Sequence, residues 1–415
     1  MTAASDLSHW HATASDAGVP ADDLPATADV AVIGGGILGA ATAYFLARGG
    51  ARPVLIEQQA IGWGATGRNG GFVTTGAAEG FLGAVARVGR EATRAVWQLT
   101  LETKPLLRDI LADEGFDCDY REPGSLNLAL NDEQYAGQQR TVAALQAEGF
   151  PGTLLDRAGV QELINTPLGP EIRGGLYGPE NGLVHSAKLV RGLATAARKH
   201  GTRLCQATVR GLTPVHGATH VATSRGAVEA GAVIVAANAL TDELVPALAG
   251  VITPVRGQVL AYAPLPRVFT TGVGAAVTPT GEYWQQALDG SIVLGGCRAV
   301  APGGEVGLRE CATTPAVQTA LEGIFPRLFP QLANLRVARR WAGLMAFTPD
   351  YLPVADRAPG LPGVWVAGGF CGHGMPFGIA LGKRLAEAAA SDTPPVAIAP
   401  LRLDRPTLAA TSIAV

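Results

Sequence analysis

The sequence lacks the features that mark several special classes of protein. No stretch of about 18 apolar residues occurs, and residues 1–18 contain neither the basic nor the apolar segment of a secretory signal. The five cysteines are widely spaced and form no CxxC pair, which argues against a disulfide framework or a zinc site. The formal net charge is −3 and there is no basic run, which argues against binding of nucleic acid or anionic lipid. These absences predict a soluble, cytoplasmic protein with no nucleic-acid, membrane or metal partner.

Length and composition indicate a folded protein with more than one domain. The 415 residues are 47% hydrophobic, enough for large cores, and a chain of this length normally forms two or three domain-sized units. The 54 glycines and 28 prolines are numerous, but their share stays below that of a low-complexity sequence. We therefore expect many glycines to stand where the backbone requires them.

The stretch ADVAVIGGGILGAATAYFLARGGARPVLIE, residues 28–57, has the pattern of a strand, a helix and a second strand. The short apolar runs at 30–33 and 53–56 are typical of buried parallel strands. Between them, apolar residues recur with helical spacing. The pattern predicts the first unit of a nucleotide-binding domain.

A GxGxxG motif stands at the turn between this first strand and the helix. Its glycines, Gly34, Gly36 and Gly39, would allow a tight turn, the approach of a pyrophosphate and close packing of helix on strand. Glu57 ends the second strand, where a carboxylate can bind the hydroxyl groups of a ribose. These residues predict a dinucleotide site, and by themselves they fit NAD and the ADP half of FAD equally well.

The rest of the chain alternates between predicted helices and strands. Helices are predicted at residues 91–112, 183–200 and 313–325. Strands are predicted at residues 125–130, in short pieces within 202–239, as antiparallel sheet within 251–299, and at 337–348. Asp289 and Gly290 form a strong hairpin signal. Residues 364–390 predict one more buried strand, a glycine-rich turn and a helix.

Seven segments, in their order and spacing, resemble a known family. They are the tryptophan segment at 9–11, the fingerprint at 34–57, GWGATGRNGGF at 62–72, NGLVHSAKLVRGLA at 181–194, PVRGQ at 254–258, WAGLMAFTPDYLPV at 341–354 and GGFCGHGMPFG at 368–378. The chain resembles the FAD-dependent D-amino acid oxidase superfamily, which includes glycine oxidase and sarcosine oxidase. Within it, the chain is most similar to the γ-glutamylputrescine oxidases.

The resemblance implies an α/β fold with two domains. One is a glutathione-reductase-type FAD-binding Rossmann domain, and the second, substrate domain has a mixed β-sheet plus helices. The expected FAD-binding domain comprises residues 26–105, 180–250 and 335–400, the substrate domain comprises 106–179 and 251–334, and 1–25 form an N-terminal extension.

The resemblance also implies FAD as the cofactor, bound without a covalent link. Gly343 stands near the position of the flavin-linking cysteine of sarcosine oxidases, and Thr66 stands where other relatives have a flavin-linking histidine. The expected cofactor contacts are Gly34, Gly36, Ile37, Leu38, Gly39, Glu57, Thr66, Gly67, Arg68, Asn69, Gly70, Gly71, Ala237, Gly343, Gly369, Gly372, His373, Gly374 and Met375. The loop at 62–72 is expected to cross the flavin, with its glycines allowing backbone amides to approach.

The implied reaction is the oxidation of a carbon–nitrogen bond. In this superfamily the flavin accepts a hydride from the carbon next to an amine, and the resulting imine hydrolyses to a carbonyl compound. O2 is the expected acceptor and H2O2 the product, and no dedicated protein base is required. The expected catalytic residues are Arg68, Tyr283 and His373, and the expected substrate pocket is lined by Trp284, Trp341, Met345, Phe347 and Phe370. Cys371 beside the turn is expected to be a packed thiol.

Two departures from the relatives bear on the substrate. Met345 replaces the arginine that binds the α-carboxylate in glycine oxidase-like members, and Pro376 replaces a lysine of the sarcosine oxidases. A buried carboxylate without a cation is unfavourable, so an amine or polyamine without an α-carboxylate is the expected substrate. An amino acid (glycine, a D-amino acid or an N-methyl amino acid) is the alternative, provided that Arg68, Arg256 or Arg298 binds the acid group.

Other roles for a flavin domain remain open from the sequence. They include a tRNA-modifying flavin module, an electron-transfer subunit of a larger dehydrogenase and a flavoprotein sensor without catalysis. The acidic charge balance weighs against RNA, and a complete sheet domain weighs against a dependent subunit. The oligomeric state is not predicted.

Overall fold

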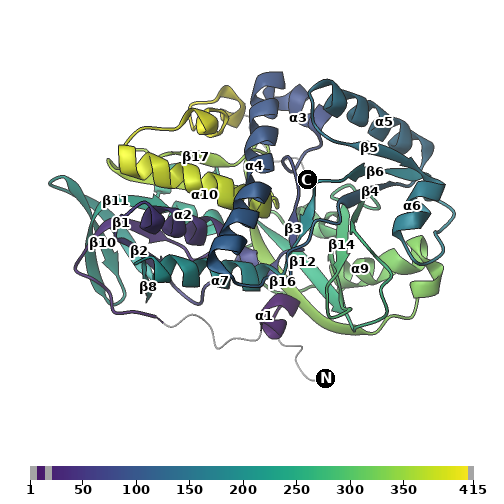
Figure 1. Ribbon diagram of the computed structural model, residues 1–415, viewed down its shortest axis with the longest axis horizontal. Coiled ribbons are helices and arrows are strands. Elements are labelled where there is room, and N and C mark those ends of the chain that lie inside the picture. The colour runs from purple at the N-terminus through teal and green to yellow at the C-terminus, as the bar shows by residue number, and fades with distance from the viewer. Residues whose placement is uncertain (1–6, 15–20, 410–415) are drawn as a thin grey trace.

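The computed structural model describes residues 7–14 and 21–409, in which two sheet-based halves lie side by side (Figure 1). Each half contains an eight-stranded sheet, and β3 (Phe72–Val73) pairs with β7 (Gly182–Leu183) in a small third sheet. Within these ranges, no helix is long and apolar enough to cross a membrane.

The first sheet has a parallel centre, as expected for a dinucleotide-binding domain. Its strands are β1 (Thr27–Ile33), β2 (Pro53–Glu57), β8 (Arg203–Gln206), β9 (Val209–Val215), β10 (Ala218–Thr223), β11 (Gly226–Val235), β17 (Val354–Arg357) and β18 (Val364–Gly368). The order is β17-β18-β11-β1-β2-β8, and β10 and β9 extend the sheet from β11. Strands β8, β2, β1, β11 and β18 are parallel, whereas β17 and the β9–β10 hairpin are antiparallel to their neighbours.

Helices cover one face of this sheet. They are α2 (Ile37–Arg48), α4 (Arg90–Glu114), α7 (Ser186–Lys199) and α10 (Gly374–Ser391), and Figure 1 shows α2, α7 and α10 in front of the strands. The other face packs against the β9–β10 hairpin and the segment around α8 (Thr241–Leu244). Because both faces are covered, central strand residues such as Val32 and Leu55 are fully buried, which explains their apolar runs.

The second sheet is mixed. Its strands are β4 (Ser125–Ala129), β5 (Thr153–Asp156), β6 (Gly174–Gly178), β12 (Thr253–Tyr262), β13 (Gly272–Ala275), β14 (Glu282–Gln286), β15 (Ile292–Gly296) and β16 (Val337–Phe347), in the order β16-β12-β15-β14-β13-β4-β6-β5. Only the β13–β4 pair among these is parallel. Helices α6 (Arg157–Leu163) and α9 (Pro315–Leu328) contribute to the core on one face, together with Phe269, Trp284 and Phe329.

The three remaining helices of the described residues are α1 (His9–Thr13), α3 (Phe81–Val88) and α5 (Asp132–Ala147). Helix α5 packs against β4, β5 and β6 of the second sheet. Figure 1 places α1 at the edge between the two halves, near β16 and α7.

The predicted α/β architecture is confirmed. The strand–helix–strand unit at residues 28–57, the hairpin at Asp289 and Gly290 and the helices at 91–112, 183–200 and 313–325 all form close to their predicted bounds. One assignment is wrong: residues 337–347 were expected in the FAD-binding domain, but β16 pairs along its whole length with β12 of the second sheet. The other predicted domain boundaries remain a proposal.

Candidate cofactor and substrate site

One large cavity, about 950 Å³ in volume, is lined by residues of both eight-stranded sheets. On the side of the first sheet it begins at the carboxyl ends of β1 and β2 and includes Ala237 after β11. On the side of the second sheet it reaches β12, β14 and β16. The carboxyl ends of parallel strands are where α/β sheets bind their ligands, and the volume is in the range of cofactor sites.

The glycine fingerprint forms the first end of this cavity. Gly34 has a φ of 110°, and a Cβ on it would lie 2.6 Å from the carbonyl oxygen of Ala236. A Cβ on Gly39 would lie 1.9 Å from the carbonyl oxygen of Gly34, so this glycine brings α2 against β1 and does not line the cavity. Gly36 precedes α2 and has no side chain of its own to cap the helix. This cradle fits a pyrophosphate.

The carboxylate of Glu57 is held in place at the wall of the same end. Its two oxygens accept hydrogen bonds from the backbone N–H groups of Gly35 (2.7 Å) and Gln59 (2.9 Å). Beside it, the hydroxyl of Thr66 accepts a hydrogen bond from the N–H of Ile37 at 3.0 Å. A fixed carboxylate next to a glycine cradle fits the ribose and pyrophosphate of a dinucleotide, so the residues present suit the ADP half of FAD.

The loop at residues 62–72 lies across the middle of the cavity, and its conformation depends on Asn69. The Asn69 side chain donates to the carbonyl of Thr66 (2.8 Å) and accepts from the N–H of Gly71 and the hydroxyl of Ser186, both at 2.8 Å. A Cβ on Gly70 would lie 2.6 Å from the ring of Tyr283. Asn69 therefore shapes a loop whose glycines allow close contact with the second sheet.

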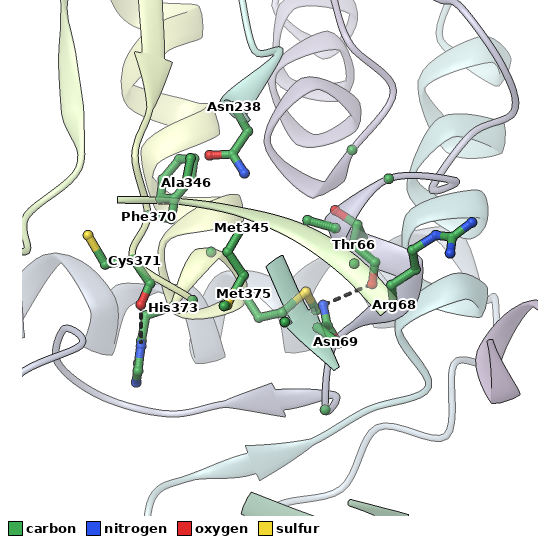
Figure 2. A pocket seen from close by; sticks show the side chains of 18 of the residues that line it. Thr66, Arg68, Asn69, Asn238, Met345, Ala346, Phe370, Cys371, His373 and Met375 are labelled. Carbon is green, nitrogen blue, oxygen red and sulfur yellow. Dashed lines mark hydrogen bonds between the residues drawn. The ribbon is translucent and has the colours of Figure 1, made fainter. Parts of the chain in front are cut away.

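The guanidinium of Arg68 does not point into the cavity as a substrate anchor would. Its Nε donates to the carbonyl of Trp63 at 3.0 Å and its Nη1 to the carbonyl of Ala342 at 2.9 Å. The same group lies over the ring of Trp63, and Figure 2 shows it directed away from Met345 and Met375. The side chain therefore joins the loop to β16, and a catalytic role of Arg68 stays a prediction.

Helix α1 holds this loop from outside, a role that sequence reasoning did not predict. Ser8 donates to the carbonyl of Gly67 at 2.5 Å, and the ring of His11 lies 3.0 Å from the carbonyl of Gly62. A Cβ on Gly67 would lie 2.2 Å from His11 Nε2, so Gly67 faces α1 and not the cavity. The only signal in the sequence was the tryptophan segment at 9–11.

The turn before α10 forms the other end of the cavity. Cys371 and Gly372 have φ values of 51° and 82°. His373 precedes α10 as its N-cap residue without a side-chain cap, and its Nδ1 lies 3.3 Å from the carbonyl of Cys371 (Figure 2). Burial lowers the pKa of His373, so its imidazole is neutral at neutral pH. Burial raises the pKa of the Cys371 thiol to about 12, which keeps it protonated. Gly369, expected to contact the cofactor, packs on Thr348 and does not line the cavity.

Alternation along β14 decides which aromatic residue faces the cavity. Tyr283 lines it, whereas Trp284 points to the opposite face and packs against Phe325 and Phe329. Trp341 is also outside the lining, because its indole N–H donates to the carbonyl of Arg68 at 2.9 Å. The expectation that Trp284 and Trp341 form the pocket is therefore wrong.

The remaining wall beside the α10 turn is apolar. Met345, Phe347 and Phe370 line it as expected. Most expected cofactor contacts also line the cavity: Gly34, Gly36, Ile37, Leu38, Glu57, Thr66, Arg68, Asn69, Gly70, Gly71, Ala237, Gly343, Gly372, His373, Gly374 and Met375. Sequence reasoning missed Asn238, Tyr351 and the α3 side of the cavity with Glu79 and Arg87.

Three comparisons identify similar proteins. A family model described as FAD dependent oxidoreductase matches residues 29–388. The gamma-glutamylputrescine oxidoreductase of Escherichia coli (strain K12) is 27% identical over 401 residues, covering 93% of this chain and 89% of that protein. The glycine oxidase of Geobacillus kaustophilus (strain HTA426) is 27% identical over 392 residues, covering 91% and 97%. The crystal structure of glycine oxidase from Geobacillus kaustophilus has the same fold, with a TM-score of 0.80 at 21% identity and coverage of 92% and 99%.

Proposed function

The chain belongs to the family of FAD-dependent oxidoreductases, and from this premise we propose that it oxidises a carbon–nitrogen bond of a small amine or amino acid, with O2 as acceptor and H2O2 as product. The names of the relatives support this proposal, because they include a gamma-glutamylputrescine oxidoreductase and a glycine oxidase. We further propose that FAD is bound without a covalent link.

The observation that carries the proposal is the continuity of the cavity. It leads from the glycine cradle at Gly34 and the carboxylate of Glu57 to an apolar wall with Tyr283, Met345 and Phe347. One cavity can therefore hold a dinucleotide at one end and a small organic molecule against the other.

FAD, when bound, supplies the two-electron acceptor for oxidation of the carbon next to the nitrogen. The chain's own contribution is the environment of that carbon. Met345, Phe347 and Phe370 exclude water from the wall, which favours the neutral form of an amine. The phenol of Tyr283 faces the cavity, and burial raises its pKa to about 12, so it remains a neutral hydrogen-bonding group.

The decisive experiment is anaerobic reduction of the purified holoenzyme. We expect the flavin absorption band to bleach on addition of single amines or amino acids, and H2O2 to appear in stoichiometric amount when air is admitted. Precipitation with acid should release the flavin into the supernatant. A protein that binds flavin but is bleached by no compound of either class would contradict the proposed oxidation. Bleaching without H2O2 on reoxidation would indicate a dehydrogenase.

A further inference from the structure

The arginines near the cavity differ in whether their charge is already neutralised. Arg87 lines the cavity, but it forms two hydrogen bonds with the carboxylate of Glu79, at 2.7 and 2.8 Å. Arg256 lies outside the lining and pairs with the buried carboxylate of Glu305. Arg68 is bound to backbone carbonyls. We therefore regard all three side chains as unsuited to bind a further anion.

Arg298 is different because no carboxylate of the described residues lies within ion-pair distance of it. Its guanidinium donates one hydrogen bond, from Nη1 to the carbonyl of Gly304 at 3.0 Å, and lies 5.1 Å from the centre of the Phe347 ring. In the same wall, Glu282 is bound by the N–H of Val277 (2.8 Å) and the hydroxyl of Thr278 (2.6 Å).

The backbone before Arg298 explains how the side chain reaches the cavity. Cys297 has a φ of 59°, in the left-handed region, and follows β15 directly. Its side chain is fully buried in the core of the second sheet, whereas the next side chain, Arg298, lines the cavity. The turn therefore presents the guanidinium to the cavity, with one N–H group already anchored.

The surroundings of Arg298 favour an anion. The titratable groups that face it are the phenol of Tyr351 and the thiol of Cys371, and burial raises the pKa of both, so both are neutral. Burial also lowers the pKa of the guanidinium itself. A partly buried cation without a counter-charge is unfavourable, and a carboxylate would relieve that cost through two parallel hydrogen bonds.

The position of Arg298 along β16 limits where that carboxylate lies. Phe347, under the guanidinium, is two residues beyond Met345, which corresponds to about 7 Å along a strand. Met345 lies beside Gly372 of the α10 turn, since a Cβ on that glycine would lie 3.4 Å from its sulfur. Phe347 instead packs with Cys371, the preceding residue of the turn. The wall next to Gly372 is therefore apolar, and the cation lies farther along β16, on the side of Cys371.

We propose that Arg298 binds a carboxylate of the substrate that is remote from the oxidised carbon, so that the substrate is an ω-amino acid or a similar amine with a distant acid group. This inference rests on the proposed oxidation of a carbon–nitrogen bond. An α-carboxylate is attached directly to the oxidised carbon and would lie in the apolar part of the wall. A carboxylate several carbon atoms away reaches the guanidinium.

The test compares three compounds with the same number of carbon atoms: δ-aminovalerate, norvaline as both enantiomers, and pentylamine. For the wild-type holoenzyme, we expect δ-aminovalerate to reduce the flavin with the lowest half-saturation concentration. Arg298→Gln should raise that concentration by about 10- to 100-fold, the loss typical of a charged hydrogen-bonded pair, and should leave the value for pentylamine unchanged. Arg298→Lys should show a smaller increase.

Arg87→Gln is the matched control, because it also removes a guanidinium from the wall, but one already neutralised by Glu79. A second measurement needs no turnover: calorimetric titration of the holoenzyme with valerate, a carboxylate without an amine. Valerate should bind to the wild type and to Arg87→Gln and should bind about 10- to 100-fold more weakly to Arg298→Gln.

The outcomes separate this inference from the proposed function. Equal values for wild type and Arg298→Gln with δ-aminovalerate and valerate would overturn it. A preference for norvaline that depends on Arg298 would also overturn it, because the carboxylate would then lie beside the oxidised carbon. If no amine or amino acid bleached the flavin, the proposed oxidation would fail, while loss of valerate binding in Arg298→Gln would still support an anion site.

Discussion

The indole N–H of Trp10 donates a hydrogen bond of 2.6 Å to the backbone carbonyl of Asn69, 59 residues away in the sequence. Trp10 is almost fully buried and also packs edge-on against the ring of His185 at the start of α7. Asn69 in turn shapes the glycine loop that lines the cavity. Helix α1 therefore links the loop to the framework of the first sheet, although it precedes the first strand in the sequence.

Replacing Trp10 tests whether α1 supports cofactor binding. Trp10→Phe keeps an aromatic ring but removes the donor to Asn69, and a typical hydrogen bond contributes about 1 kcal/mol. We expect FAD to bind about 5-fold more weakly to the apoprotein of this variant, measured by quenching of flavin fluorescence.

Trp284→Phe is the matched control for this prediction. Trp284 is also fully buried, but it lies in the core of the second sheet and its N–H has no hydrogen-bond partner within the described structure. Its replacement should leave FAD affinity unchanged, even where it lowers thermal stability. Equal FAD affinity in wild type and Trp10→Phe would show that the loop keeps its conformation without α1.

Gly39 offers a test of the glycine fingerprint. In Gly39→Ala the new Cβ would lie 1.9 Å from the carbonyl oxygen of Gly34, so α2 would have to move away from β1. We expect a loss of stability on the order of 3 kcal/mol and loss of bound FAD, seen as a lower melting temperature and a missing flavin spectrum.

Gly83→Ala in the exposed part of α3 provides the comparison. The atoms nearest to its new Cβ would belong to Glu79, at 3.7 Å or more, and alanine in a helix is favoured over glycine by about 1 kcal/mol. This variant should be as stable as the wild type or slightly more stable. A stable, flavin-containing Gly39→Ala protein would show that the packing of α2 on β1 is not as tight as described.

The sequence predicted the elements around the dinucleotide better than the substrate wall, for a physical reason. Gly34, Gly39 and Glu57 serve a backbone geometry that recurs wherever a strand, a tight turn and a helix bind a pyrophosphate. Gly34 and Gly39 stand at the tight turn and the helix contact that this spacing predicts. Glu57 ends β2 and accepts from the N–H of Gly35, and its contact with a ribose stays a prediction.

The substrate wall depends on choices that local spacing does not determine. In the run EYWQQ either Tyr283 or Trp284 could face the cavity, and only the packing of α9 on the other face decides between them. Likewise, Arg68 and Arg298 are both single arginines in glycine-rich segments. Their difference arises from partners distant in the sequence, since Ala342 binds Arg68 and Phe347 lies under Arg298.

His185 makes stability depend on pH in the mildly acidic range. Its Nδ1 accepts a hydrogen bond from the N–H of Lys188 at 3.3 Å, which caps α7, and its Nε2 lies 3.0 Å from the hydroxyl of Thr13. Burial, only partly opposed by Asp119, lowers the pKa of His185 to about 4 from the ordinary value of 6.5. Between these two values the unfolded chain binds a proton that the folded chain does not, so acidification favours unfolding.

We therefore expect the stabilisation from neutral His185 to be complete above about pH 6.5 and to be lost as the pH falls towards about 4, by up to about 3 kcal/mol. His185→Asn keeps a capping side chain without a titrating group. Its melting temperature should fall less than that of the wild type between about pH 7.5 and about pH 5. Identical pH dependence in both proteins would mean that His185 does not titrate on unfolding as described.

The pH dependence of the proposed oxidation should belong to the substrate and not to the protein. In the described lining, burial raises the pKa values of Tyr283 and Cys371 to about 12 and lowers that of His373, so none of these groups changes charge near pH 8 to 10. Only the neutral amine has a lone pair available, so the rate of anaerobic flavin reduction should rise with pH through the pKa of the amine.

Two substrates with well-separated amine pKa values should therefore give pH profiles with two different midpoints. The Tyr283→Phe variant should keep both midpoints even where it slows the reaction. A single midpoint shared by both amines would show that a protein group titrates and would contradict the view that the wall acts only by orienting a neutral amine.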